Sequence, residues 1–230
     1  GIPVGHTPGV LTDSTADMAF ALMLGVARNI VPGAAYARSG QWKTGEPALL
    51  LGQPLHGATL GIIGYGRIGQ AVARRSRGFE MRVLVYTRHL SEADAGRDGV
   101  QRASLEDLLR ESDFVSIHTP LLPETHHLIG ARELALMKLT AVIVNTARGE
   151  IIDPQALADA LKHGRPGYAA LDVTEPEPLP ADHPLYGLPN CLIVPHLGSA
   201  TVHTRLEMTR IAMANLEAGL RGAPLLHRAN

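Results

Sequence analysis

The hydrophobic pattern of the chain changes near residue 60. Before that point, residues 16–28 (ADMAFALMLGVAR) are apolar on nearly every side of a helix. Such a helix needs burial all round, in a core or against a second subunit. From residue 60 onward, short apolar runs rich in β-branched residues alternate with stretches of helical pattern. The second part of the chain therefore reads as strands and helices in turn.

The strands and helices predicted from this pattern share one arrangement, in which a helix follows most strands. Strands are expected at 60–63, 83–86, 114–117, 142–145, 168–173 and 191–194. Helices are expected at 16–28, 32–39, 68–77, 104–110, 131–137, 154–163 and 201–220, with start signals at Ser104 and at Asp153-Pro154. Strands that are apolar on both faces and alternate with helices indicate an α/β fold, a doubly wound parallel sheet of the Rossmann type.

A glycine motif, GYGRIG, follows the first of these strands and opens the next helix. It consists of Gly64, Tyr65, Gly66, Arg67, Ile68 and Gly69. In this context the first glycine permits a tight turn, the second lets the backbone approach a pyrophosphate, and the third allows close helix–strand packing. The helix N-terminus then offers free N–H groups to the phosphates. The motif predicts a dinucleotide site, and a purely structural glycine turn is the alternative.

The second strand ends in Thr87 and Arg88, where dinucleotide-binding proteins usually carry an acid for the adenosine ribose. A hydroxyl and a guanidinium suit the oxygens of a 2′-phosphate instead. One charge-assisted hydrogen bond contributes roughly 1.5–3 kcal/mol. These residues predict NADP(H) as the preferred cofactor and NAD(H) as the weaker one. The alternative is that Arg88 and His89 form a solvated turn.

Three polar residues follow later strands. Arg148 comes after 142–145, Glu177 lies in the proline-rich loop after 168–173, and His196 comes after 191–194. In an open parallel sheet, ligands bind outside the carboxyl ends of the strands, so these side chains are expected to share one crevice. Taken singly, each has a plainer explanation: a turn arginine, a solubilising loop acid, and a packed or surface histidine.

Five separated motifs together resemble the D-isomer-specific 2-hydroxyacid dehydrogenase family, and within it the glyoxylate/hydroxypyruvate reductases. In order they are GIPVGHTPGVLTDSTADMAF, GIIGYGRIGQAVARR, NTARGEIID, LDVTEPEPLP and HPLYGLPNCLIVPHLGSAT. The resemblance implies that Arg148 binds a 2-oxo acid, that His196 donates a proton to it, and that Glu177 orients His196 and favours its charged form. It matches the family's acid to Glu177 rather than to Glu175. It also implies that four more residues contact the cofactor: Pro120, Thr146, Asp172 and Gly198.

The resemblance also implies a domain organisation. Residues 1–5 would be a remnant of a discontinuous substrate-binding domain, 6–195 the NAD(P)-binding domain, and 196–230 the C-terminal helix and tail of the substrate-binding domain. On this interpretation the chain is part of a larger enzyme, and its glyoxylate reduction by itself is expected to be weak or absent. Residues 201–220 would then expose apolar surface. Family members dimerise through the helices near the start of the NAD(P)-binding domain, so a homodimer is expected.

Composition narrows the class of protein further. The formal net charge is −1, with no blocks of like charge, which disfavours nucleic acid as a partner. The longest apolar run, 19–27, is far shorter than the ~20 residues of a membrane span. A single cysteine, Cys191, favours a reducing, cytoplasmic compartment. The pair His126-His127 lacks the spacing of a metal site, and none is predicted.

Three alternatives remain open at this stage. The first is another member of the family, an NAD-linked phosphoglycerate or lactate dehydrogenase, which would usually keep an acid near Thr87. The second is a nucleotide-sensing binding module on the same fold, and the third is an inactive cofactor-binding fragment. Assays of glyoxylate, hydroxypyruvate and pyruvate with NADPH and with NADH would discriminate among them.

Overall fold

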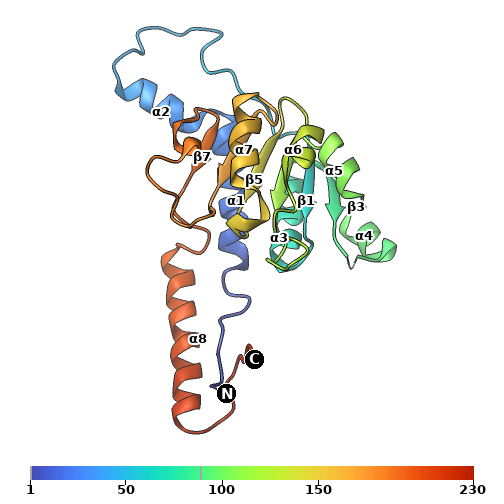
Figure 1. The fold of residues 1–230 in the computed structure, drawn as a ribbon, viewed down its shortest axis with the longest axis vertical. Helices are drawn as coiled ribbons and strands as arrows, with labels where there is room; N and C mark the ends of the chain where they lie inside the picture. Colours follow the sequence, from blue (N-terminus) through green and yellow to red (C-terminus); the bar gives the residue numbers. More distant parts are fainter. Residues whose placement is uncertain (1, 89) are drawn as a thin grey trace.

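A computed structural model describes residues 2–88 and 90–230, so Gly1 and His89 lie outside the described residues. Within these residues, seven parallel strands form one sheet in the order β3-β2-β1-β4-β5-β6-β7 (Figure 1). The strands are β1 (Thr59–Ile63), β2 (Arg82–Tyr86), β3 (Gln101–Arg102), β4 (Phe114–Ile117), β5 (Val142–Asn145), β6 (Tyr168–Leu171) and β7 (Cys191–Ile193). The predicted doubly wound parallel sheet is confirmed, and its strand order reverses between β1 and β4.

Most of the helices lie close to their predicted positions. They are α1 (Thr12–Ala27), α2 (Ile30–Arg38), α3 (Arg67–Ser76), α4 (Glu92–Asp98), α5 (Leu105–Glu111), α6 (Ala131–Leu136), α7 (Pro154–Lys162) and α8 (Val202–Leu220), with short 3₁₀ turns at η1 (Arg77–Phe79), η2 (Gly149–Ile151) and η3 (Pro184–Gly187). The Ser104 side chain accepts a hydrogen bond from the Asp107 N–H (3.1 Å), and Asp153 accepts one from the Ala156 N–H (3.0 Å). Both predicted helix caps are therefore present.

The sequence pattern missed β3 and α4. Both residues of β3 are exposed at the sheet edge, so burial imposes no hydrophobic pattern on them. Helix α4 has seven residues and joins the core mainly through Ala95. Strand β6 also ends at Leu171, two residues before its predicted end. Short or exposed elements leave little trace in the hydrophobic periodicity.

Side chains from the two faces of the sheet form two separate cores. Leu60 and Ile62 of β1 join a core covered by α1, α3 and α4, whereas Ile63 joins a core covered by α5, α6 and α7. The alternation follows from the two-residue period of a strand. Because both faces are covered, the ligand-accessible part of the sheet is the edge where the strands end.

Helix α1 lies in the core of its own chain. Its buried residues include Ala16, Ala19 and Met23, and it packs against α3, β5 and β6. The sequence left two ways to bury this apolar helix, in a core or against a second subunit, and the structure shows burial in the core of the same chain. Among the described residues, no single helix is long and apolar enough to cross a membrane, and α1 with α2 meets those criteria only as a pair bent by 58°.

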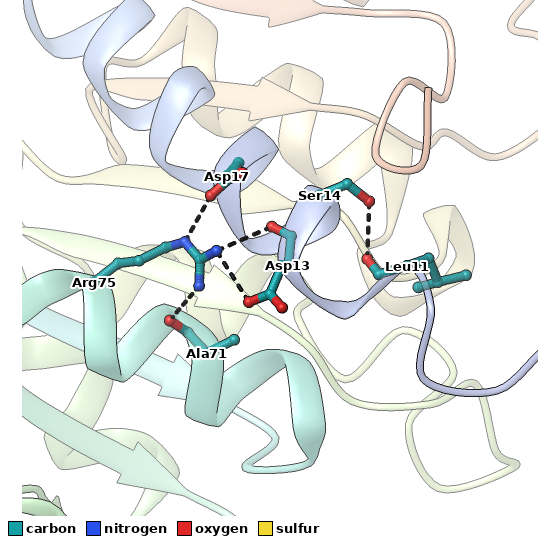
Figure 2. A network of polar contacts seen from close by, with 6 residues as sticks. All are labelled: Leu11, Asp13, Ser14, Asp17, Ala71 and Arg75. Carbon is teal, nitrogen blue, oxygen red and sulfur yellow. Dashed lines mark hydrogen bonds and ion pairs between the residues drawn. The ribbon is translucent and has the colours of Figure 1, made fainter. Parts of the chain in front are cut away.

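Arg75 fastens α1 to the glycine-motif helix α3, as Figure 2 shows. Its Nε donates to Asp17 Oδ1 (2.7 Å), and its Nη2 donates to Asp13 Oδ1 (3.1 Å). The same guanidinium donates to the Ala71 carbonyl within α3 (3.1 Å). The cluster sets the first turns of α1 beside α3, where Leu11 and Thr15 line a cavity at the carboxyl ends of the strands.

Helix α8 extends away from the sheet, and both chain ends lie near its far end (Figure 1). The His6 N–H donates to the His227 carbonyl (3.0 Å), and the Ala229 N–H donates to the Val4 carbonyl (2.8 Å). Asn215 of α8 is buried between these segments and hydrogen-bonds to both. The first residues and the C-terminal tail therefore form one unit with α8. That helix exposes five large apolar side chains: Val202, Leu206, Met213, Leu216 and Leu220.

Candidate active site

The glycine turn joins β1 to α3 with the geometry that the motif predicts. Gly64 has a φ of +93°, and a Cβ there would lie 2.6 Å from the Thr119 backbone nitrogen. A Cβ on Gly69 would lie 2.2 Å from the Gly64 carbonyl oxygen, so α3 packs directly on the turn. A Cβ on Gly66 would meet nothing within 4 Å. The backbone at Gly66 is therefore open to a ligand, as pyrophosphate binding requires.

Beside this turn lies a cavity of about 600 Å³ that Thr87 and Arg88 line from one side. The Arg88 guanidinium forms an ion pair with Glu124, which belongs to the loop after β4. The pKa of the Glu124 carboxyl is lowered by a hydrogen bond from its own backbone N–H and by Arg88. Glu124 also lines the cavity, and no pattern in the sequence marked it. The lining of the cavity thus contains a cation and an anion that pair with each other.

Tyr65 lines the same cavity but uses its hydroxyl elsewhere. The phenol donates to Asp98 Oδ2 at the end of α4 (3.1 Å). Burial raises the pKa of Tyr65 to about 12, and the Asp98 carboxylate adds to the increase. Tyr65 therefore ties the glycine turn to α4 and stays neutral.

A second cavity, of about 820 Å³, contains Arg148 and His196. The two strand-end residues thus meet, as the sequence predicted. The four predicted cofactor-contacting residues outside the glycine motif and the end of β2 also line the cavity: Pro120, Thr146, Asp172 and Gly198. Pro120 lines the first cavity as well, and a third cavity of about 500 Å³ beside Gly66, Arg67 and Ile68 shares Arg148 with the second. Together the three cavities form one crevice at the carboxyl ends of the strands.

Arg205 and Met208 of α8 complete the second cavity. They lie within the predicted helix 201–220, but no strand-end position marked them. Arg205 places a second guanidinium in the same cavity as Arg148. The cavity is therefore suited to a small anion.

The turn that carries Arg148 is held by hydrogen bonds to Asn145, the buried last residue of β5. The Asn145 side chain donates to the Arg148 carbonyl (2.8 Å) and accepts from the Ala147 N–H (3.0 Å). A Cβ on the following Gly149 would lie 2.0 Å from the Thr174 carbonyl oxygen, so the turn packs against the loop after β6. The backbone is held while the guanidinium remains exposed.

His196 and Glu177 form a hydrogen-bonded pair, with His196 Nδ1 2.6 Å from Glu177 Oε1. Both side chains are nearly half exposed, at 49% and 43%. Glu177 lies outside the large cavity and lines a neighbouring one of about 420 Å³ on the other side of His196. The carboxylate is thus placed to orient the imidazole from behind.

Asp172 holds the turn that carries His196. Its buried carboxylate accepts the Leu197 N–H (2.5 Å) and the Gly198 N–H (2.8 Å), and its carbonyl accepts the His196 N–H (2.9 Å). His196 itself has a φ of +54°, in the left-handed region. Asp172 therefore supports the catalytic candidate in addition to lining the cavity.

His118, which the sequence analysis did not single out, lines all three cavities of the crevice. Its Nε2 lies 2.8 Å from Ser116 Oγ, and its Nδ1 lies 3.4 Å from Thr146 Oγ1. Burial lowers the pKa of His118 to about 3, so the imidazole is neutral. The usable sequence signal was its place directly after a strand, the same rule that marked Arg148 and His196.

Glu175 pairs with a histidine of its own. His127 Nε2 lies 2.7 Å from Glu175 Oε2, and His126 Nε2 lies 3.9 Å from Glu175 Oε1. The two histidine rings are stacked, with centroids 4.0 Å apart and planes inclined by 28°. The loop after β6 therefore carries two carboxylates, each facing a different histidine.

A parallel sheet with a glycine turn at its switch point, and an arginine and a His–Glu pair at its strand ends, defines a nicotinamide-dependent oxidoreductase. Residues 20–198 match the profile of the D-isomer specific 2-hydroxyacid dehydrogenase, NAD binding domain. The chain belongs to this family, as its motifs indicated.

Relatives cover almost the whole chain. The glyoxylate reductase of Korarchaeum cryptofilum is 50% identical, covering 96% of this chain and 67% of its own length. The glyoxylate reductase of Thermococcus litoralis is 48% identical, covering 96% of this chain and 68% of its own length. The crystal structure of the TT0316 protein from Thermus thermophilus is 52% identical, with a TM-score of 0.94 over 100% of this chain and 72% of that one. This chain spans about two thirds of the length of the two curated relatives.

Proposed function

We propose that the protein reduces a small 2-oxo acid, glyoxylate or hydroxypyruvate, to the 2-hydroxy acid with NADPH, giving the D isomer where C2 is chiral. The observation that carries the proposal is the meeting of Arg148 and His196 in one cavity, with Glu177 behind the imidazole. The similarity to proteins named glyoxylate reductase supports this choice of substrate.

Arg148 is suited to bind the substrate. A guanidinium can hold a carboxylate through two parallel hydrogen bonds and polarise the neighbouring keto oxygen. The turn beneath Arg148 is fixed by Asn145, so the side chain starts from a defined backbone position. Arg205 adds positive charge to the same cavity. This pair favours a small anionic substrate over a neutral one.

His196 is suited to act as the general acid. Its Nδ1 faces Glu177, so Nε2 is left to donate a proton. The proton goes to the keto oxygen of the substrate, where negative charge develops as hydride adds to C2. The Glu177 carboxylate fixes the orientation of the imidazole, and the reduction requires the protonated ring as its proton donor. Bound NADPH would supply the hydride that reduces C2 of the keto acid.

The crevice fits a dinucleotide. The open backbone at Gly66, with Arg67 and Ile68 beside it, would hold the pyrophosphate at the start of α3. Pro120, together with the cavity-lining residues Thr146, Asp172 and Gly198, would border the nicotinamide half. Gly64 and Gly69 shape the turn and need no contact with the ligand.

The preference for NADPH rests on Thr87 and Arg88. Both line the cavity next to the glycine turn, where the adenosine ribose would lie. Arg88 already pairs with one anion, Glu124, and a 2′-phosphate would take the place of that carboxylate. Glu124 also offers an acceptor to a 2′-hydroxyl, so the NAD-linked alternative has an observation in its favour.

Steady-state assays test the function directly. Glyoxylate, hydroxypyruvate and pyruvate would each be reduced with NADPH and with NADH at equal ionic strength. We expect glyoxylate or hydroxypyruvate with NADPH to give the highest kcat/KM. Equal dissociation constants for NADPH and NADH would overturn the cofactor preference, and a higher kcat/KM for pyruvate than for the other two acids would overturn the substrate assignment.

The domain organisation and location also remain proposals. Residues 6–195 would form the NAD(P)-binding unit, while 1–5 and 196–230 would belong to a substrate-binding unit. The backbone pairing of Val4 and Gly5 with the C-terminal tail supports that grouping. Cys191 as the sole cysteine supports a cytoplasmic location.

We also propose a homodimer, formed through the segment around α2 rather than through α1. This segment exposes Ile30, Val31, Trp42 and Leu51, whereas α1 is largely buried in its own chain. Exposed apolar side chains of this size, close together along the chain, suit an interaction surface. Sedimentation at micromolar concentration should give a dimer, and a monomer there would contradict the proposal.

A further inference from the structure

One residue, His127, joins the three loops that follow β4, β5 and β6. It lies in the loop after β4, and its backbone N–H donates to the Glu150 carbonyl (2.8 Å), two residues after Arg148. Its imidazole Nε2 lies 2.7 Å from Glu175 Oε2, two residues before Glu177. The substrate-binding turn and the acid-bearing loop are therefore linked through a single residue.

The backbone of His127 suggests that this contact is maintained at some conformational cost. Its φ is +49°, in the left-handed region, which is uncommon for non-glycine residues although His, like Asn and Asp, adopts it more often than most. Such a conformation persists where the surrounding structure holds it. At His127 both the backbone N–H and the imidazole are engaged, and the His126 ring stacks on its outer face.

The position of Glu177 depends on the loop that carries it, because its carboxylate has few contacts. Within the described part of the chain, the hydrogen-bond partner of its carboxylate is His196. An exposed ion pair of this kind is weak by itself, since both side chains lose conformational freedom to form it. Fixing the loop backbone beforehand removes part of that entropic cost.

We propose that His127 is a positioning residue for the acid–base pair: through Glu175 it holds the loop after β6 so that Glu177 stays against His196. The proposal rests on the proposed function, in which His196 is the general acid. The groups that face His127 are the Glu175 carboxylate and the stacked His126 imidazole. The residue before Glu175 is held as well, because Gly149 packs against Thr174.

The main test substitutes His127→Asn, since asparagine tolerates a positive φ but cannot reproduce the reach of the imidazole. His127→Gln restores an amide donor of greater length, and His126→Asn is the matched control at the neighbouring position. Two readouts are needed: kcat and KM for glyoxylate with NADPH, and the pH at which the His196 ring loses its proton, followed by NMR. Thermal unfolding confirms that each variant is folded.

In His127→Asn we expect kcat to fall about tenfold while the KM for NADPH is unchanged. We expect the His196 ring to lose its proton at a lower pH than in the wild type, because the Glu177 carboxylate no longer lies against the imidazole. His127→Gln should recover most of both effects, and His126→Asn should behave like the wild type. A purely structural role would lower the thermal stability without moving the His196 titration.

An unchanged His196 titration in a folded His127→Asn variant overturns the proposal, and so does an equal shift in His126→Asn. If His127→Asn does not fold, Glu175→Ala removes the same contact from the opposite loop and should give the same shift. The NMR titration does not depend on turnover. If the protein reduces neither glyoxylate nor hydroxypyruvate, the proposed function fails, while the titration still decides whether His127 positions Glu177.

Discussion

Glu177 Oε1 lies 2.6 Å from His196 Nδ1, although the two residues come from different loops, one after β6 and the other after β7. They meet because these strands are parallel neighbours, with Leu171 opposite Ile193 in the register, and both strands end at the same edge. The pair is exposed, so it orients the imidazole and contributes little to the stability of the fold.

Replacing Glu177 by glutamine keeps a hydrogen-bond acceptor beside His196 but removes the negative charge. We expect kcat for glyoxylate reduction to fall about ten- to a hundredfold, a part of what a general acid usually contributes. The loss should be smallest at low pH, where the imidazole is protonated without help. A pH profile of kcat checks this, with Asp182→Asn, an exposed acid further along the chain, as the control. A uniform loss at all pH values would contradict the assigned role.

Arg148→Lys tests whether the fork geometry of the guanidinium matters. Lysine keeps the charge but cannot form two parallel hydrogen bonds to a carboxylate. We expect kcat/KM for the keto acid to fall about ten- to a hundredfold, the equivalent of one charge-assisted hydrogen bond. The dissociation constant for NADPH should not change. An equal loss in NADPH affinity would place Arg148 at the cofactor instead.

The ion pair between Arg88 and Glu124 yields a prediction about cofactor choice. Arg88→Ala should weaken NADPH binding about tenfold or more and leave NADH nearly unchanged, because only NADPH carries the 2′-phosphate. Glu124→Gln should strengthen NADPH binding, since Arg88 no longer has to leave a carboxylate. Fluorescence titration at several salt concentrations measures both, and screening should reduce each difference. Parallel losses for the two cofactors would refute this assignment.

His118 should make the folded protein sensitive to acid. Burial lowers its pKa to about 3, below the unfolded value near 6.5, so the unfolded chain binds the proton more readily. Its contribution to stability is therefore constant above about pH 6.5 and declines as the pH falls toward 3. Because His118 is partly exposed, we expect a loss of about 1 kcal/mol between pH 6.5 and 5. Urea unfolding at the two pH values measures this loss. In His118→Asn the difference in unfolding free energy between pH 6.5 and pH 5 should be smaller than in the wild type, and an equal difference would count against a neutral imidazole.

Two alanine substitutions in the glycine turn should separate folding from binding. Gly69→Ala places a Cβ 2.2 Å from the Gly64 carbonyl oxygen, and overpacking of this kind costs about 1–3 kcal/mol of unfolding free energy. Gly66→Ala meets no protein atom within 4 Å, so stability should hold while NADPH affinity falls. Chemical denaturation and NADPH titration measure the two effects. Equal stability losses would mean that Gly66 is structural as well.

The local pattern of the sequence was enough to predict the main architecture. Six strands, the glycine turn and the helix caps at Ser104 and Asp153 could be predicted because burial, tight turns and capping act over a few residues. Arg148 and His196 could be placed together by the rule that parallel strands end at one edge. The exposed strand β3 and the short helix α4 could not be predicted, since neither has a face that must be hydrophobic.

The sequence by itself thus determined the order of elements, the dinucleotide turn and the residues at the strand ends. The tertiary structure decided which partners those residues face: Glu124 for Arg88, His127 for Glu175, and the backbone of the β7 turn for Asp172. It also decided that α1 is buried in its own chain. These contacts join side chains from separate loops and helices. Such pairing depends on how the elements pack in space, and periodicity along the chain carries no record of it.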